Sequence, residues 1–183
     1  MLEKMIAYFC APALAGIKPA NLITCYKAKM PHIHQDIAAL NGQLNRKDIY
    51  LTILCECEKR VLVMVYRKKE LSLYLNKQEV KLFLDSFHYP KGSLLKQIET
   101  LKMRFQTEKF PHEVGAFLGY PICDINGFIL HRDEGCLMTG EWKVYDNVSA
   151  AQKLFARYAS CRGALVKRVE QGKTLAEIFG AVS

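Results

Sequence analysis

A chain of 183 residues, 50% of them hydrophobic and 24% charged, has the composition of a globular protein, which excludes an intrinsically disordered chain. This length fits one domain over residues 1–183, and its core needs neither disulfides nor a metal ion. No apolar run approaches the ~18–20 residues of a membrane-spanning helix. The formal net charge of +8 excludes no class of function by itself, because its meaning depends on where the charges lie.

The positive charge is concentrated in the middle of the chain. Residues 59–109 hold 12 lysine and arginine residues against 5 acidic residues, whereas residues 110–140 hold 1 against 4. A basic excess of this kind attracts polyanions such as nucleic acids. It is also typical of amphipathic helices whose charged face lies in water. A nucleic-acid or polyanion binder therefore stays open as an alternative function.

Seven cysteines are spread over the chain, and their odd number leaves at least one thiol unpaired. A chain of this size needs no disulfide framework, so we expect reduced cysteines and a cytoplasmic protein. The apolar stretch Met5–Pro12 loosely resembles a secretory signal peptide. It is short, it contains a proline and it follows Glu3, and these features argue against export.

The first part of the chain predicts a small sheet. Asn21–Tyr26 is a candidate strand, and Ile33–Leu44 has the spacing of a helix. Ile49–Glu56 and Arg60–Tyr66 are rich in β-branched and aromatic residues and are joined by a short polar turn, which predicts a β-hairpin. Both faces of this hairpin carry apolar side chains, so we expect helices to cover at least one face. Leu71–Leu75 fits either a strand or a helix.

The middle of the chain predicts a series of helices. Asn76 and Glu79 have the spacing of a capping box, which predicts a helix that begins at Asn76. An amphipathic helix follows Pro90–Gly92. Pro111 then opens a short helix that ends at Gly119.

The last part predicts a helix over Ile122–His131, a strand over Leu137–Tyr145 and a helical tail. Within the tail, Gly172 indicates a helix end, and the segment Thr174–Glu177 has the spacing of a second capping box. Strands are few, helices are many, and they do not alternate as βαβ units. This order predicts an α+β fold, with a small antiparallel or mixed sheet around the hairpin at 49–66, several covering helices and a helical C-terminal tail.

The segment Val114–Ile129 has the spacing of a helix-turn-helix motif. Gly119 would form the turn, and small and apolar residues would let the two helices cross closely. A DNA-reading second helix needs polar or basic side chains. Here that helix has no lysine or arginine and carries Asp124, whose charge repels phosphates. We therefore interpret the motif as helix packing.

Side chains that bind metals or transfer protons gather in one acidic segment. They are His112, Glu113, Asp124, His131, Asp133, Glu134 and Cys136. Their spacing matches no established metal site, and adjacent residues such as His112 and Glu113 point to different faces of a helix. Two further candidates lie in the segment Cys10–Asn21, whose glycine and proline residues predict a loop. Cys10 could be a reactive thiol or an axial ligand to haem, and Lys18 could bind an anion.

Three stretches of the chain form one pattern, Cys10–Leu22, Phe110–Pro121 and Gly140–Tyr145. Together they resemble a bacterial family typical of clostridial anaerobes, the domain-of-unknown-function family 3793. Relatives usually have Cys-Pro-Pro-Thr-Leu in the first stretch, whereas this chain has Ala11 and Ala13 in place of the first proline and the threonine. The resemblance implies a cytoplasmic bacterial protein, and it assigns neither a reaction nor a catalytic residue.

The polar residues of this pattern lead to a hypothesis about one site. We expect Cys10, Lys18 and Asn21 of the first stretch to meet His112 and Glu113 of the second and to line a single pocket. The leading hypothesis is a protein that binds a small ligand or a metal ion there, with a thiol-dependent enzyme as one variant. The alternatives are the polyanion binder and a protein–protein adaptor without a catalytic site. The sequence names no cofactor, substrate, partner or oligomeric state.

Overall fold

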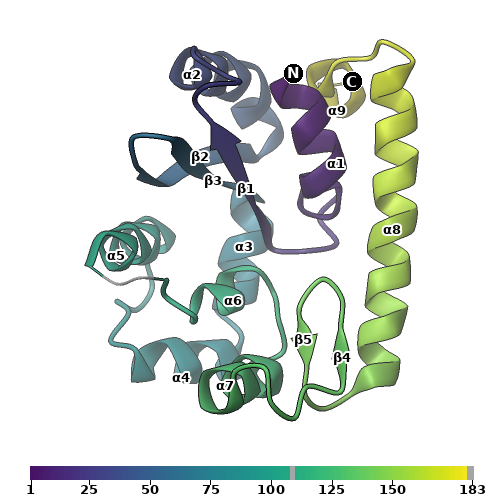
Figure 1. Cartoon of the computed structure of the whole chain (residues 1–183). Helices are drawn as coiled ribbons and strands as arrows, with labels where there is room; N and C mark the ends of the chain where they lie inside the picture. Colours follow the sequence, from purple (N-terminus) through teal and green to yellow (C-terminus); the bar gives the residue numbers. More distant parts are fainter. Residues whose placement is uncertain (108–109, 181–183) are drawn as a thin grey trace. The chain divides into compact units, whose positions relative to one another are not determined.

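The computed structural model describes residues 1–107 and 110–180, so residues 108 and 109, which end the basic segment, lie outside the described residues. The chain divides into two compact units (Figure 1). Unit 1 contains residues 1–71 and 160–180, and unit 2 contains residues 72–159. The described residues form helices together with a three-stranded and a two-stranded antiparallel sheet, which confirms the predicted α+β class. A single domain over residues 1–183 stays a prediction.

The three-stranded sheet belongs to unit 1. It contains β1 (Ala20–Tyr26), β2 (Ile49–Glu56) and β3 (Arg60–Arg67) in the order β1-β3-β2. The central strand β3 pairs with both neighbours, so that Val63 lies opposite Ile23 of β1 and Ile53 of β2. The predicted strands and hairpin are confirmed, with a shift of one residue at the start of β1 and at the end of β3.

Helices pack on the face of this sheet that carries Val61, Val63 and Val65. α1 (Leu2–Leu14) contacts β1 and β3, whereas α2 (Ile33–Leu44) contacts β2, the short 3₁₀ helix η1 (Asn45–Lys47) and α9 (Leu175–Gly180). The predicted bounds of α2 are confirmed. The side-chain amide of Asn41 bonds both backbone groups of Leu51 at 2.9 Å, so α2 covers the outer edge of β2.

The structure corrects the loop expected at Cys10. α1 continues through Cys10 and Pro12. A proline inside a helix leaves the carbonyl four residues earlier without its usual donor. That carbonyl belongs to Tyr8, and it accepts a hydrogen bond of 2.7 Å from Nε of Arg162 in α8 (Val148–Glu170). A distant side chain therefore replaces the bond that the proline removes, and the helix is not broken there.

Unit 2 begins within α3 (Lys68–Leu75) and ends within α8. The elements between them are α4 (Gln78–Ser86), α5 (Leu94–Thr107), α6 (Val114–Phe117), α7 (Ile122–His131), β4 (Met138–Thr139) and β5 (Lys143–Val144). The predicted bounds of α7 are confirmed, and the ambiguous segment Leu71–Leu75 is helical. None of the helices in residues 1–107 and 110–180 is long and apolar enough to cross a membrane.

Two expected features of unit 2 are wrong in detail. α4 begins after Lys77, and the amide of Asn76 instead donates to the carbonyl of Ser72 at 2.7 Å. The expected strand over Leu137–Tyr145 is a hairpin of the two short strands β4 and β5. The backbone reverses where the N–H of Gly140 donates to the carbonyl two residues later, at 3.0 Å.

The C-terminal predictions are confirmed. α8 ends at Glu170, shortly before Gly172, whose φ of 89° lies in the left-handed region that favours glycine. The backbone N–H of Thr174 donates to the Glu177 carboxylate at 2.7 Å, and the N–H of Glu177 donates to the Thr174 hydroxyl at 3.2 Å. These reciprocal bonds form the predicted capping box at the start of α9.

Candidate functional site

Three of the predicted site residues belong to unit 1. Cys10 is fully buried, and this burial raises the pKa of its thiol well above the ordinary value, while the positive charge of Lys18 acts in the opposite direction. A thiol that keeps its proton is a poor nucleophile and a poor metal ligand, which argues against thiol chemistry at Cys10. Asn21 accepts the backbone N–H of Ala13 at 3.2 Å, so its side chain joins β1 to α1. Cys10 is therefore packed in the core of unit 1, and Asn21 links β1 to α1.

The other two predicted residues, His112 and Glu113, directly precede α6 in unit 2. The buried carboxylate of Glu113 accepts a hydrogen bond of 3.0 Å from the hydroxyl of Tyr89 and another from Nε of Arg104. A buried carboxylate held by a cation and a phenol ties α5 to the start of α6. Since Cys10 and His112 belong to different units, one pocket shared by all five residues stays a prediction.

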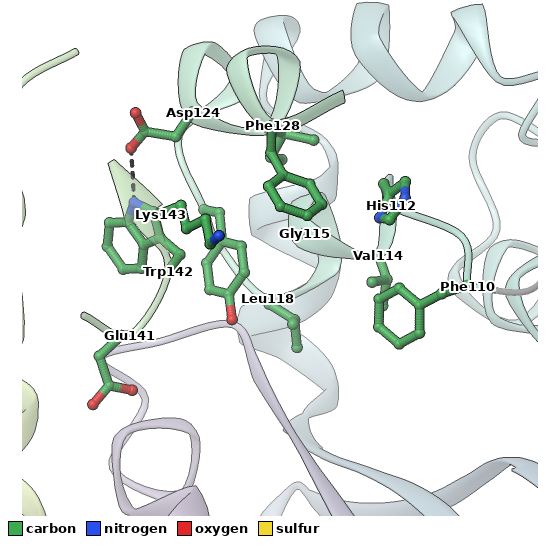
Figure 2. A pocket seen from close by; sticks show the side chains of 12 residues that line it. Phe110, His112, Val114, Gly115, Leu118, Asp124, Phe128, Glu141, Trp142 and Lys143 are labelled. Atoms are coloured by element: carbon green, nitrogen blue, oxygen red, sulfur yellow. Dashed lines mark hydrogen bonds between the residues drawn. The ribbon is translucent and has the colours of Figure 1, made fainter. Parts of the chain in front are cut away.

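A cavity of about 220 Å³ lies beside His112, and all of its lining residues belong to unit 2 (Figure 2). Aromatic side chains form much of its wall, and aliphatic residues of α6 and α7 complete it. The wall includes Phe110, His112, Tyr120, Phe128 and Trp142. The sequence predicted His112 as a site residue. It did not predict that Phe128 and Trp142 line the same cavity, because only tertiary packing brings these two residues together.

Asp124 fixes the position of Trp142 in this wall (Figure 2). One carboxylate oxygen accepts the indole N–H at 2.7 Å, and the other accepts the backbone N–H of Tyr145 at 2.7 Å. Asp124 lies in the first turn of α7, where the helix dipole also favours a negative charge. This buried residue therefore fastens the hairpin to α7, which explains why an acidic residue stands in the second helix of the helix-turn-helix pattern.

Aromatic contacts hold the Trp142 ring on two further sides. The ring centroids of Tyr120 and Trp142 lie 5.1 Å apart at a tilt of 30°, and Phe155 of α8 meets the indole edge-on at 4.6 Å. Burial, followed by the charge of Glu141, raises the pKa of Tyr120 to about 12, so this phenol is neutral at physiological pH. The Trp142 side of the cavity is thus a fixed surface.

Glycines allow the close contacts beneath this surface. A Cβ added to Gly115 of α6 would lie 3.0 Å from Ile125 of α7, and one added to Gly127 would lie 2.5 Å from the ring of Tyr145. Gly119, with a φ of 74°, forms the turn between the two helices. The predicted close crossing of two helices around Gly119 is confirmed.

Charged and polar groups lie near the Phe128 ring of this wall. Nε2 of His112 accepts a hydrogen bond from the Arg132 guanidinium, so this nitrogen carries no proton. The amine of Lys143 pairs with the exposed Asp133 and lies 5.8 Å from the ring centroid of Phe128. Arg132 and Lys143 thus bring two positive charges to the ring of Phe128, while Glu141 adds a negative charge to the lining.

Metal ligands do not gather in the same way. In residues 1–107 and 110–180, no group of three or more histidine, cysteine, aspartate and glutamate side chains is arranged to hold a metal ion. Glu113 and Asp124 bind protein donors instead. Among the cysteines, Cys10 and Cys25 are buried, whereas Cys57 and Cys123 are exposed.

The comparison with known families gives one match. Residues 6–179 match the family described as "Protein of unknown function (DUF3793)". The chain belongs to this family. A search of curated proteins and a search of solved structures each found no match.

Two of the three stretches that resemble the DUF3793 family supply most of the residues that line the aromatic cavity, and α7 supplies the others. Phe110–Pro121 supplies His112, α6 and Tyr120, and Gly140–Tyr145 supplies the hairpin turn with Trp142. A signal for the cavity was therefore present in the sequence, in the aromatic and glycine residues of these stretches rather than in their ionisable residues.

Proposed function

We propose that this DUF3793 protein binds a small aromatic carboxylate in the cavity of unit 2. The observation that carries the proposal is a wall of four aromatic rings and one imidazole around a space of about 220 Å³. Aromatic walls bind flat apolar ligands through dispersion and through offset or edge-on ring contacts. Because Asp124 already holds Trp142 in place, little side-chain entropy is lost when a ligand binds.

The size of the cavity limits the ligand. Sites for drug-sized molecules usually measure roughly 300–1,000 Å³, so a cavity of about 220 Å³ suits a ligand with one ring or two fused rings. Larger cofactors such as haem or a dinucleotide would not fit inside it.

Lys143 and Arg132 favour a negative charge at one end of the ligand. Lys143 is paired with Asp133, whose side chain is 79% exposed. Exposed ion pairs of this kind are weak, so a ligand carboxylate can replace Asp133 at small cost. The His112 imidazole contacts the rings of Phe110 and Phe128, with centroids 5.9 and 5.1 Å away and interplanar angles of 49° and 75°.

The experiment is a titration that uses Trp142 as the reporter, because it is the single tryptophan of the chain. Benzoate is the probe, and cyclohexanecarboxylate is the control that carries the same charge without a flat ring. Benzoate is expected to change the Trp142 fluorescence saturably, whereas cyclohexanecarboxylate binds more weakly. Isothermal titration calorimetry gives the affinities independently of fluorescence.

Matched variants locate the binding. Phe128→Ala removes part of the aromatic wall and should weaken benzoate binding by about tenfold, the equivalent of ~1.4 kcal/mol of lost apolar contact. Phe9→Ala removes a half-exposed ring of unit 1 and should leave the affinity unchanged. Lys143→Met should weaken benzoate binding and leave that of the neutral benzyl alcohol unaltered. The absence of saturable binding, or equal affinity in the Phe128→Ala and native proteins, would refute the proposal.

A further inference from the structure

A second cavity, of about 360 Å³, lies in unit 2 beside α4 and α5. Leu84, Tyr89 and Gln97 form its buried part, and the exposed Lys81 and Lys91 belong to its rim. It shares no lining residue with the aromatic cavity, so it is a separate place on the same unit.

Gln97 is the unusual residue of this cavity. It is 9% exposed and lies in the second turn of α5, and its side chain lines the cavity. Its backbone N–H donates to the carbonyl of Ser93 at 3.0 Å, whereas within residues 1–107 and 110–180 no group bonds its side-chain amide. Among the described residues, the one side-chain nitrogen or oxygen that is fully enclosed without a partner is Oδ1 of Asn45, so the Gln97 amide is open to the space of the cavity. The NH₂ group and the carbonyl oxygen of the Gln97 side chain can therefore form hydrogen bonds with a ligand in the cavity.

The charges around the cavity favour an anion. Lys91 pairs with Asp85 at 2.9 Å, and the two charges balance each other. Lys81 forms no ion pair with an acidic residue of the described chain, so its charge remains uncompensated. The rim residue Gly92 lies just before the start of α5, whose first turn contains no acidic residue. The positive end of the helix dipole therefore adds to the charge of Lys81.

We infer that this cavity binds a small organic oxyanion, either a phosphate ester or a polycarboxylate. The Gln97 amide donates to the ligand inside the cavity, and Lys81 binds its charge at the rim. Both ligand classes offer several oxygen acceptors to an amide and an ammonium group. The volume of about 360 Å³ exceeds that of an inorganic ion, so the oxyanion carries an organic part that lies against Leu84 and Tyr89.

The test is a titration of the full-length, ¹⁵N-labelled protein followed by NMR. Ribose 5-phosphate and citrate are the two probes, one for each ligand class, and ribose is the uncharged control. The side-chain NH₂ signals of Gln97 are expected to shift saturably with one or both anions and to stay unchanged with ribose. The probe that binds identifies the ligand class. If neither anion gives a saturable shift, the inference is overturned.

Substitutions separate a ligand-binding role of Gln97 from a structural one. Gln97→Leu should weaken anion binding at least tenfold, because it removes the amide that donates to the ligand, and should leave the midpoint of thermal unfolding without anion close to that of the native protein. Gln106→Leu makes the same change at an exposed position of α5 and should leave the affinity unaltered. Lys81→Ala, at an exposed rim position that does not affect folding, should weaken anion binding severalfold. Native affinity in both Gln97→Leu and Lys81→Ala would overturn the inference.

Discussion

Replacement of Asp124 by alanine is the most direct test of how the aromatic wall is held together. The carboxylate of Asp124 is buried, with 3% exposure, and accepts the Trp142 indole N–H and the Tyr145 backbone N–H, each at 2.7 Å. A hydrogen bond to a charged group contributes about 1.5–3 kcal/mol, so the loss of two should reduce the free energy of unfolding by roughly 3–5 kcal/mol. Asp124→Asn keeps one acceptor oxygen and should cost about half as much.

Urea denaturation gives the measurement. Fluorescence follows Trp142 itself, and circular dichroism follows the helices of both units, so coincident transitions would indicate that the chain unfolds in one step. Glu134→Ala removes an exposed carboxylate of the same unit and should change the free energy of unfolding by less than about 0.5 kcal/mol. A loss below about 1 kcal/mol in Asp124→Ala would refute the reasoning, because a carboxylate with two buried donors cannot be removed at so small a cost.

Three further predictions concern glycine packing, thiol reactivity and alkaline stability. Gly127→Ala should lower the free energy of unfolding by about 1–3 kcal/mol in urea denaturation, because the added Cβ would overlap the ring of Tyr145. Gly163 has open space around it inside α8, so Gly163→Ala should raise the free energy of unfolding by about 0.5–1 kcal/mol. Backbone hydrogen bonds from the turn that follows Cys57 lower the pKa of this exposed thiol, so it should react first with a disulfide reagent at neutral pH. Cys57→Ser should abolish this fast phase of the reaction, and Cys10 should react only after unfolding. A fast phase that persists in Cys57→Ser would contradict the prediction. Burial raises the pKa of Tyr120 to about 12, whereas a tyrosine in the unfolded chain has a pKa of about 10. The unfolded state therefore loses this proton first, and the free energy of unfolding falls as the pH rises from about 10 to about 12. Tyr120→Phe should make this fall shallower in denaturation measured across that range, and an unchanged slope would contradict the assignment.

Local patterns in the sequence determined most of the secondary structure. The alternation and β-branched content of 49–56 and 60–66 predicted the hairpin, and the 3.6-residue spacing of 33–44 and 122–131 predicted α2 and α7 with their observed bounds. The residues that specify these elements are near neighbours in the sequence, so the local pattern already contains the information. The capping box at Thr174 was predictable for the same reason, because both partners lie within one helical turn.

The tertiary structure decided the features that depend on distant partners. Pro12 indicated a break, yet α1 passes through it because Arg162, 150 residues further along the chain, bonds the carbonyl that the proline leaves without a donor. Ionisable residues likewise drew attention to Cys10 and Glu113, and both are buried in the fold. Whether a polar side chain contacts a ligand or the protein depends on burial and on its partners, and only folding brings Asp124 to Trp142 and opens the Gln97 side-chain amide to its cavity.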